Sequence, residues 1–250
     1  MREYLFACGC PRSGTTALWR VLASHPAVVM GNERFILKSS ADNYELRPEL
    51  YEFDRFFEYR EGDTHFPDLT GARRGEQYRK LREKTDTARY RGDKIPFLYR
   101  HYDQFFNDFS SARVVFIFRN IFDVASSYKA RFDDVGDSWS AKVEDAIADW
   151  NHSLNASLRI FEARQNSILF IEYESLFFDT DDINQKKNRI LEFLGLADAM
   201  DFRGAIKNES TYSQRLDNTR PSLLSTAEKR AIMHGADFGA YQQVLEVSSH

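Results

Sequence analysis

Residues 9–16, near the N-terminus, have the types and spacing that bind a phosphate group. They read GCPRSGTT, which fits the P-loop pattern G-x-x-x-x-G-K-[S/T] except that Thr15 replaces the lysine. Glycines let backbone amides approach an anion closely, and a helix that begins after the loop directs its positive end toward that anion. The missing lysine is the group that reaches the outer phosphates of a nucleoside triphosphate. We therefore predict a phosphate site that is not built for ATP, formed by Arg12, Ser13, Gly14, Thr15 and Thr16.

A second anion site is predicted at the end of a later strand. Residues 119–128 read RNIFDVASSY, which places Arg119 at a strand terminus and the hydroxyl of Ser127 eight residues later on the next helix. A parallel sheet binds ligands at the carboxyl ends of its strands, and arginine forms strong charge-assisted bonds with phosphate. We therefore expect a ligand with two separated phosphates. Taken alone, the loop at 9–16 could also be an ordinary turn between a strand and a helix.

Apolar runs alternating with helical patterns indicate the elements that position these residues. A helix is predicted to begin at residue 15 and to stop before Pro26, because the residue before a proline avoids the helical region. Residues 36–92 lack a clear period, so we expect short helices and loops there. Such alternation predicts one α/β domain over residues 1–250, with a mainly parallel central sheet flanked by helices. The other predicted elements are strands at 4–10, 27–30, 111–118 and 167–173, and helices at 121–131, 143–161 and 188–194.

Composition narrows the class of partner and the cellular setting. The formal net charge of -4 gives no global basic field, which argues against nucleic-acid binding. Only Cys8 and Cys10 could form a thiol pair, and their spacing in an apolar run predicts two buried small side chains on one face of a strand. No apolar run reaches the length of a signal-peptide core or a membrane span. We expect a cytoplasmic protein, and the sequence carries no signal for an oligomeric state.

Four segments together resemble the sulfotransferases that use 3′-phosphoadenosine-5′-phosphosulfate (PAPS). Residues 11–26, PRSGTTALWRVLASHP, resemble the 5′-phosphosulfate loop of that family, and RNIFDVASSY resembles its 3′-phosphate motif. Residues 93–97, DKIPF, resemble its lysine-proline element, and FIEYESL with RILEFLGL resembles its YE-x-L strand and LGL helix. The spacing is closer to the tyrosylprotein and bacterial carbohydrate branches than to the phenol and steroid branch. This resemblance implies a P-loop-like fold with PAPS as donor, adenosine 3′,5′-bisphosphate (PAP) as product, and no metal.

The resemblance also implies catalytic roles for individual residues. Glu33, 21 residues after Arg12, matches the catalytic base of the tyrosylprotein branch. Lys94 matches the electrophile at the bridging oxygen, Arg12 would join the 5′-phosphate to the sulfuryl oxygens, and Tyr173 would help to position the nucleotide. The cytosolic branch has a histidine close after the lysine, where this chain has Ile95, so a histidine base is not expected.

Several alternatives stay open from the sequence. Glu33 could instead be a solvated loop carboxylate or the partner of Arg34, and Tyr173 a core residue. Arg215 and Arg220 are candidates for the 3′-phosphate site, although each is better explained as a solvated arginine. The acceptor is a hydroxyl compound, with a carbohydrate or other small metabolite favoured over a protein tyrosine, and residues 36–92 are expected to be an insertion at the acceptor site. A P-loop kinase for small molecules or nucleotides is the alternative enzyme, and a nucleotide-binding module without chemistry is the alternative binding protein.

Overall fold

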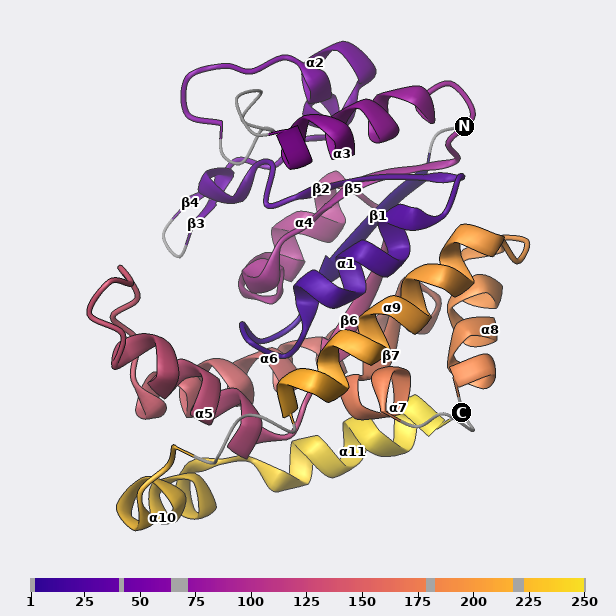
Figure 1. Cartoon of the computed structure of the whole chain (residues 1–250). Coiled ribbons are helices and arrows are strands. Elements are labelled where there is room, and N and C mark those ends of the chain that lie inside the picture. Colours follow the sequence, from indigo (N-terminus) through magenta and orange to yellow (C-terminus); the bar gives the residue numbers. More distant parts are fainter. Residues whose placement is uncertain (1–2, 41–42, 64–71, 179–182, 218–222, 250) are drawn as a thin grey trace.

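A five-stranded sheet forms the centre of the computed structural model, which describes residues 3–40, 43–63, 72–178, 183–217 and 223–249 (Figure 1). The strands lie in the order β2-β5-β1-β6-β7, and every neighbouring pair is parallel. This arrangement confirms the predicted single α/β domain with a mainly parallel sheet. The strands are β1 (Glu3–Cys8), β2 (Val28–Asn32), β5 (Tyr90–Lys94), β6 (Arg113–Phe118) and β7 (Ile168–Glu172).

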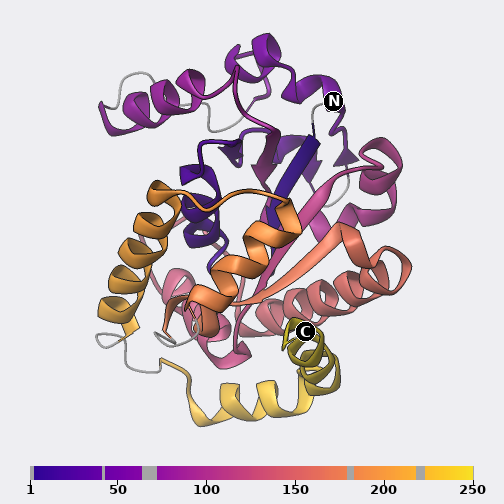
Figure 2. The ribbon, with the colours of Figure 1, turned by 90° about the vertical axis from the view of Figure 1, so that its right-hand side faces the viewer.

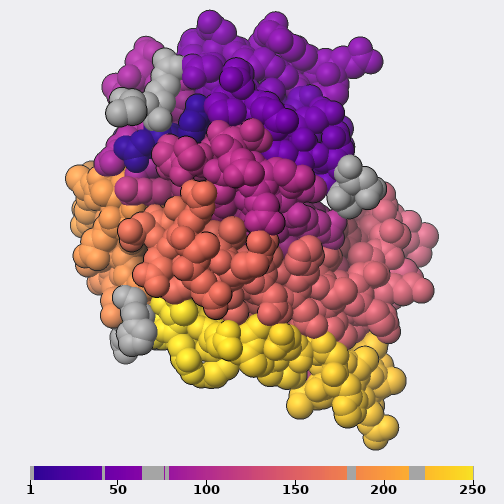
Figure 3. Space-filling model, turned by 180° about the vertical axis from the view of Figure 1, so that it is seen from behind, coloured from indigo at the N-terminus to yellow at the C-terminus, as the bar shows by residue number. Residues whose placement is uncertain are grey.

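Helices cover both faces of this sheet because side chains alternate along each strand. In β1, Leu5 and Ala7 join the cluster under α1, α7, α8 and α9, whereas Phe6 and Cys8 join the cluster under α4, α6 and α11. Figure 2 shows the orange helices and α6 on opposite sides of the strands, and Figure 3 shows yellow α11 lying against α6. The helices on the first face are α1 (Thr15–Ser24), α7 (Tyr173–Phe177), α8 (Ile183–Leu194) and α9 (Met200–Asp217). On the second face lie α4 (Tyr102–Asp108), α6 (Val143–Ala163) and α11 (Phe238–Ser249), with α5 (Ile121–Phe132) and α10 (Thr226–Gly235) packed on α6.

Strand β5 was not predicted, although it lies between β2 and β1. Its sequence YRGDK contains no apolar run, yet all five residues are buried. Gly92 is required at this position because a Cβ atom there would lie 1.7 Å from the carbonyl oxygen of Leu5 on β1. A sequence pattern that equates central strands with apolar residues therefore fails for β5, which carries two residues important for the site, Asp93 and Lys94.

The segment between β2 and β5 consists mainly of short helices, as expected, but it also contains a pair of two-residue strands and the twelve-residue helix α3. Aromatic side chains attach it to the core: the Phe35 and Tyr51 rings meet edge to face with centroids 5.4 Å apart. Its elements are η1 (Ile36–Lys38), the hairpin β3 (Ser39–Ser40) and β4 (Asn43–Tyr44), η2 (Pro48–Tyr51), α2 (Phe53–Phe57) and α3 (Ala72–Glu83). Residues 64–71 lie outside the described part of the chain.

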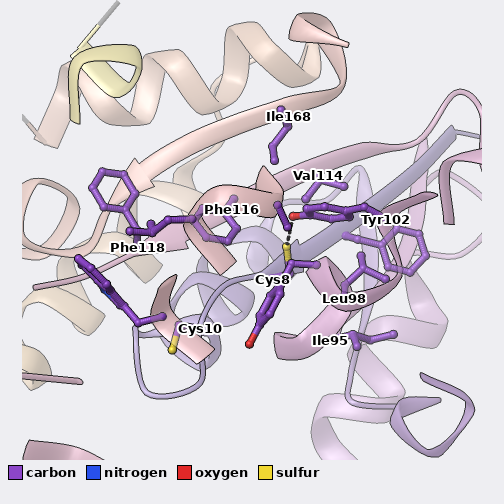
Figure 4. Close-up of a cluster of buried hydrophobic side chains, with 14 of the residues drawn as sticks. Cys8, Cys10, Ile95, Leu98, Tyr102, Val114, Phe116, Phe118 and Ile168 are labelled. Carbon is purple, nitrogen blue, oxygen red and sulfur yellow. Dashed lines mark hydrogen bonds between the residues drawn. The ribbon is translucent and has the colours of Figure 1, made fainter. Parts of the chain in front are cut away.

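The two cysteines are free and buried in the same apolar cluster (Figure 4). The Cys8 sulfur lies 3.0 Å from the hydroxyl oxygen of Tyr102, and burial raises the pKa of this thiol to about 12. Because β1 ends at Cys8, Cys10 lies in the following loop and not on the strand face that its spacing suggested. Both thiols are packing groups.

No helix in the described ranges is both long enough and apolar enough to cross a bilayer.

Candidate functional site

The loop between β1 and α1 is shaped for an anion by its backbone. Arg12 and Gly14 both have positive φ angles, of 70° and 94°, so the chain turns sharply before α1 begins at Thr15. Its N-cap residue Gly14 forms no side-chain cap, so the N–H groups of the first turn of α1 point toward a ligand position. A Cβ atom on Gly14 would lie 2.3 Å from a ring carbon of Tyr173, so only glycine fits between the loop and this ring.

A cavity of about 290 Å³ lies against the loop and contains most of the predicted nucleotide-binding residues. Ser13 is the exception: it is fully buried, it is absent from the cavity wall, and its N–H donates to the carbonyl of Cys10 at 3.1 Å. The wall also includes residues that sequence reasoning missed, on α1 and α9: Arg20, Glu209, Tyr212 and Ser213. The predicted residues in the wall are Arg12, Gly14, Thr15, Thr16, Arg119, Ser127 and Tyr173.

The two predicted phosphate sites meet within this one cavity. The Nε atom of Arg12 donates to the Ser127 hydroxyl at 2.9 Å, although the two residues are 115 positions apart. The guanidinium of Arg119 lies 4.3 Å from the ring centroid of Tyr173. The backbone carbonyl of Arg119 accepts a hydrogen bond from the Trp150 indole at 2.9 Å. Arg220 lies outside the described residues, as does the side chain of Arg215.

Arg119 is held by carboxylates that the sequence did not identify as part of the site. Its Nε atom donates to Glu174 at 3.2 Å, and Asp123 lies 3.5 Å from its Nη2 atom. Burial raises the pKa of Glu174 to about 7 although the charge of Arg119 acts in the opposite direction. The buried Oε2 atom of Glu174 accepts no hydrogen bond from the described residues. The charge of Arg119 is therefore shared with two carboxylates beside the cavity.

Glu33 and Lys94 form an ion pair at the ends of two adjacent strands. Parallel pairing places Asn32 of β2 beside Lys94 of β5, and the N–H of Glu33 donates to the Lys94 carbonyl at 3.0 Å. The Lys94 ammonium contacts the Glu33 carboxylate and lies 3.4 Å from the Thr16 hydroxyl, so the pair adjoins the phosphate loop. The Lys94 side chain is only 3% exposed, and burial lowers its pKa even though Glu33 favours its charged form.

The backbone at Glu33 is fixed by buried charges that sequence reasoning missed. Glu33 has a φ of 61°, which is uncommon for a residue other than glycine. The carboxylate of Asp93 accepts the N–H groups of Arg34 at 3.1 Å and Phe35 at 2.9 Å. Arg34 itself is buried and pairs with Asp63 at 3.0 Å. Asp93 therefore ties the residues after Glu33 to the strand that carries Lys94.

Comparisons with known proteins identify the family and the fold of the chain. A model described as the sulfotransferase family matches residues 5–200. The sulfotransferase domain from the curacin biosynthetic pathway is 14% identical over 95% of this chain and 99% of its own, with a TM-score of 0.55. A mouse sulfotransferase complexed with PAP is 13% identical over 99% and 86% (TM-score 0.54), and a sulfotransferase from Alicyclobacillus acidocaldarius is 17% identical over 97% and 99% (0.51). A search of curated proteins finds no match. At these identities the structural likenesses show the fold alone.

Proposed function

The chain belongs to the sulfotransferase family, and from this membership we propose that its site moves a sulfuryl group from PAPS to an acceptor hydroxyl. One observation carries the proposal. The cavity with three arginines and the P-loop adjoins the Glu33–Lys94 pair through Thr16. The proposed phosphate-binding site and the proposed acid–base pair therefore lie next to each other.

The residues present fit a nucleotide with two phosphate positions. Arg12, Gly14, Thr15 and Thr16 would hold the 5′-phosphosulfate at the start of α1. In the same cavity, the cationic and hydroxyl groups of Arg119 and Ser127 would hold the 3′-phosphate, and Tyr173 would support the nucleotide. When bound, PAPS supplies a sulfuryl group whose S–O bond to the phosphate breaks as the acceptor oxygen attacks. The mouse structure complexed with PAP supports this assignment of the ligand.

Glu33 is the proposed general base. Its carboxylate accepts the proton of the acceptor hydroxyl, and because its side chain is 26% exposed it can pass that proton to solvent afterwards. Lys94 and Arg12 stabilise the negative charge that develops on the leaving phosphate. These cations and the end of α1 provide the positive charge that magnesium provides in kinases, so we propose transfer without a metal.

Calorimetric titration with PAP tests the nucleotide assignment. Arg119→Ala should weaken PAP binding by about 1.5 to 3 kcal/mol, the range for a hydrogen bond to a charged group. Arg159→Ala is the matched control, because Arg159 pairs with Asp103 and is 57% exposed, away from the cavity wall. Unchanged affinity in Arg119→Ala would refute the 3′-phosphate assignment.

A second comparison separates the sulfotransferase from the alternative kinase. PAP in the presence of EDTA should raise the melting temperature, since a ligand that binds only the native state stabilises it. Activity should persist in EDTA as well. Stabilisation by ATP with magnesium alone, and turnover that chelation abolishes, would favour the kinase.

The nature of the acceptor is also a proposal. Residues 36–92 are proposed as an outer part of the acceptor site, because His101 of η3 (Pro96–His101), which follows Lys94, bonds to the Ser40 carbonyl of the β3–β4 hairpin at 2.7 Å. A carbohydrate or other small metabolite remains the favoured class of acceptor.

A further inference from the structure

A second cavity, of about 460 Å³, opens between η3, α6 and the connection from α5 to α6. That connection rises at the left edge of Figure 1, below the β3–β4 hairpin. None of the cavity's wall residues belongs to the nucleotide cavity. The residues that decide its chemistry are Phe97, Arg100, Trp139, Asp145 and Asp149.

One wall of this cavity is joined to the phosphate loop and to Lys94. Phe97 follows Lys94 by three residues, and the carbonyl of the intervening Pro96 accepts the N–H of Gly9 at 3.3 Å. On α5, Ser127 contacts Arg12 in the nucleotide cavity, while its neighbour Tyr128 donates to Asp149 in the second cavity at 3.1 Å. The neighbouring residues Ser127 and Tyr128 therefore connect the two cavities.

The opposite wall lies within the electrostatic reach of the reacting groups. The backbone N–H of Trp139 donates to Asp137 at 3.0 Å, and Asp137 binds Arg131 through both carboxylate oxygens. The pKa of Arg131 is raised first by that bond and further by the charge of Glu33. The pKa of Asp137 is lowered chiefly by its bond to Arg131, with a smaller effect from Arg12. Together with the contacts of the first wall, this places the cavity beside the loop that carries Arg12 and the strand end that carries Lys94, the partner of Glu33.

The walls combine flat apolar faces with a preformed polar pair. The Trp139 indole N–H is already bonded to the Ala141 carbonyl at 3.1 Å, and the Arg131 guanidinium lies 4.6 Å from the indole ring centroid. A ligand would therefore meet the part of the indole surface that lines the cavity. The Arg100 guanidinium lies 4.1 Å from the ring centroid of Phe97 and 2.5 Å from a carboxylate oxygen of Asp149. A sugar ring has the complementary chemistry, with an apolar C–H face to cover an aromatic ring and hydroxyls that both donate and accept.

The charge around the cavity selects against anions. The charged residues of its wall are Arg100, Asp145 and Asp149, so the wall carries a net negative charge, and the charge of Arg100 is matched by Asp149. An acceptor that carries a carboxylate or sulfate would therefore be repelled, whereas a neutral acceptor would not.

We propose that this cavity binds a neutral polyhydroxylated ring, such as an uncharged saccharide, and presents one of its hydroxyls to Glu33. The inference rests on the proposed sulfuryl transfer and specifies its acceptor. Trp139 would select the acceptor by stacking on its ring, and the acidic surroundings would select against charged acceptors.

Ligand-observed NMR with the PAP-saturated protein tests the site directly. The probes are neutral methyl hexosides, each paired with its uronic acid, and 4-nitrophenol. Binding should be seen for at least one neutral hexoside and be tenfold weaker or more for its uronic acid. Trp139→Ala should abolish hexoside binding without changing PAP affinity. Tyr59→Ala, which removes an aromatic side chain that is 64% exposed and away from the cavity wall, should leave both unchanged.

Two further measurements complete the test: transfer of the labelled sulfuryl group from PAPS to each probe, and probe binding by a variant with altered charge. Ser138→Lys adds a cation to the exposed rim and should reduce the preference for the neutral hexoside over its uronic acid by threefold or more. If PAP binds but the protein binds no neutral hexoside, or binds and sulfates only phenols or uronic acids, the acceptor inference is overturned while the proposed function stands. If neither PAP binding nor transfer to any probe occurs, the proposed function fails, and the inference fails with it.

Discussion

Replacing Glu33 by glutamine tests the proposed mechanism most directly. The amide preserves the size of the side chain but cannot take the proton of the acceptor hydroxyl. General bases contribute roughly 10² to 10⁴-fold to a rate, so the single-turnover rate should fall by that factor. Affinity for PAP should change little, because Glu33 is not part of the nucleotide cavity wall.

The structure adds an effect on stability. The Lys94 ammonium would lose its carboxylate partner while it stays buried, with the Thr16 hydroxyl 3.4 Å away. Breaking a fully buried ion pair costs about 3 to 5 kcal/mol. Because Glu33 is partly exposed and water can approach it, we expect a smaller loss, about 1 to 3 kcal/mol, the cost of an unsatisfied buried group. This loss in the free energy of unfolding should shrink as pH rises past the lowered pKa of Lys94, because a neutral amine needs no negative partner.

Three measurements on one protein preparation test whether Glu33 is the general base. They are the single-turnover rate with labelled PAPS, PAP affinity by calorimetry, and urea unfolding at several pH values. Glu76→Gln is the matched control, because Glu76 forms an exposed pair with Lys80 on α3 and should affect none of the three. A Glu33→Gln protein that binds PAP normally and reacts within about threefold of wild type, far below the range for a general base, would remove Glu33 from the mechanism.

Three further substitutions probe the groups that shape the site. Asp93→Asn replaces a carboxylate that accepts two backbone N–H groups, so unfolding at pH 8 should show a loss of about 1 to 3 kcal/mol. This loss of stability should widen as pH falls through the pKa of about 7, because that pKa lies above the unfolded value and protonation therefore stabilises the wild type but not the variant; a constant loss across pH would contradict this. Gly14→Ala places a methyl group against a tyrosine ring and should weaken PAP binding by at least about tenfold, on the scale of an overpacked contact, whereas Gly204→Ala, which meets no atom within 4 Å, should not. In the wild type, PAP affinity should increase as pH falls from 8.5 to 6.5, because Glu174 with a pKa of about 7 becomes neutral and releases Arg119; calorimetry on Glu174→Gln should show a flatter profile, and an unchanged slope would refute this role.

The sequence by itself determined the local parts of the site. The turn at Gly9–Gly14 follows from residues that are neighbours in the chain, because a glycine with positive φ and a helix start need no distant partner. The apolar runs of β1, β6 and β7 were recognisable because their side chains are buried on both faces of the sheet. From these runs the parallel sheet could be predicted, together with the positions of Arg12, Arg119 and Ser127 near strand ends.

Only the tertiary structure decided which charged groups meet. The place of β5 in the sheet is not visible in YRGDK, since its buried Asp93 and Lys94 are satisfied by residues 58 to 61 positions earlier. The second cavity likewise depends on the packing of η3 against α6, which joins Arg100 to Asp149 across 49 residues. A charged side chain is stable inside a protein when a partner offsets its desolvation, and that partner is supplied by the fold and not by the neighbouring sequence.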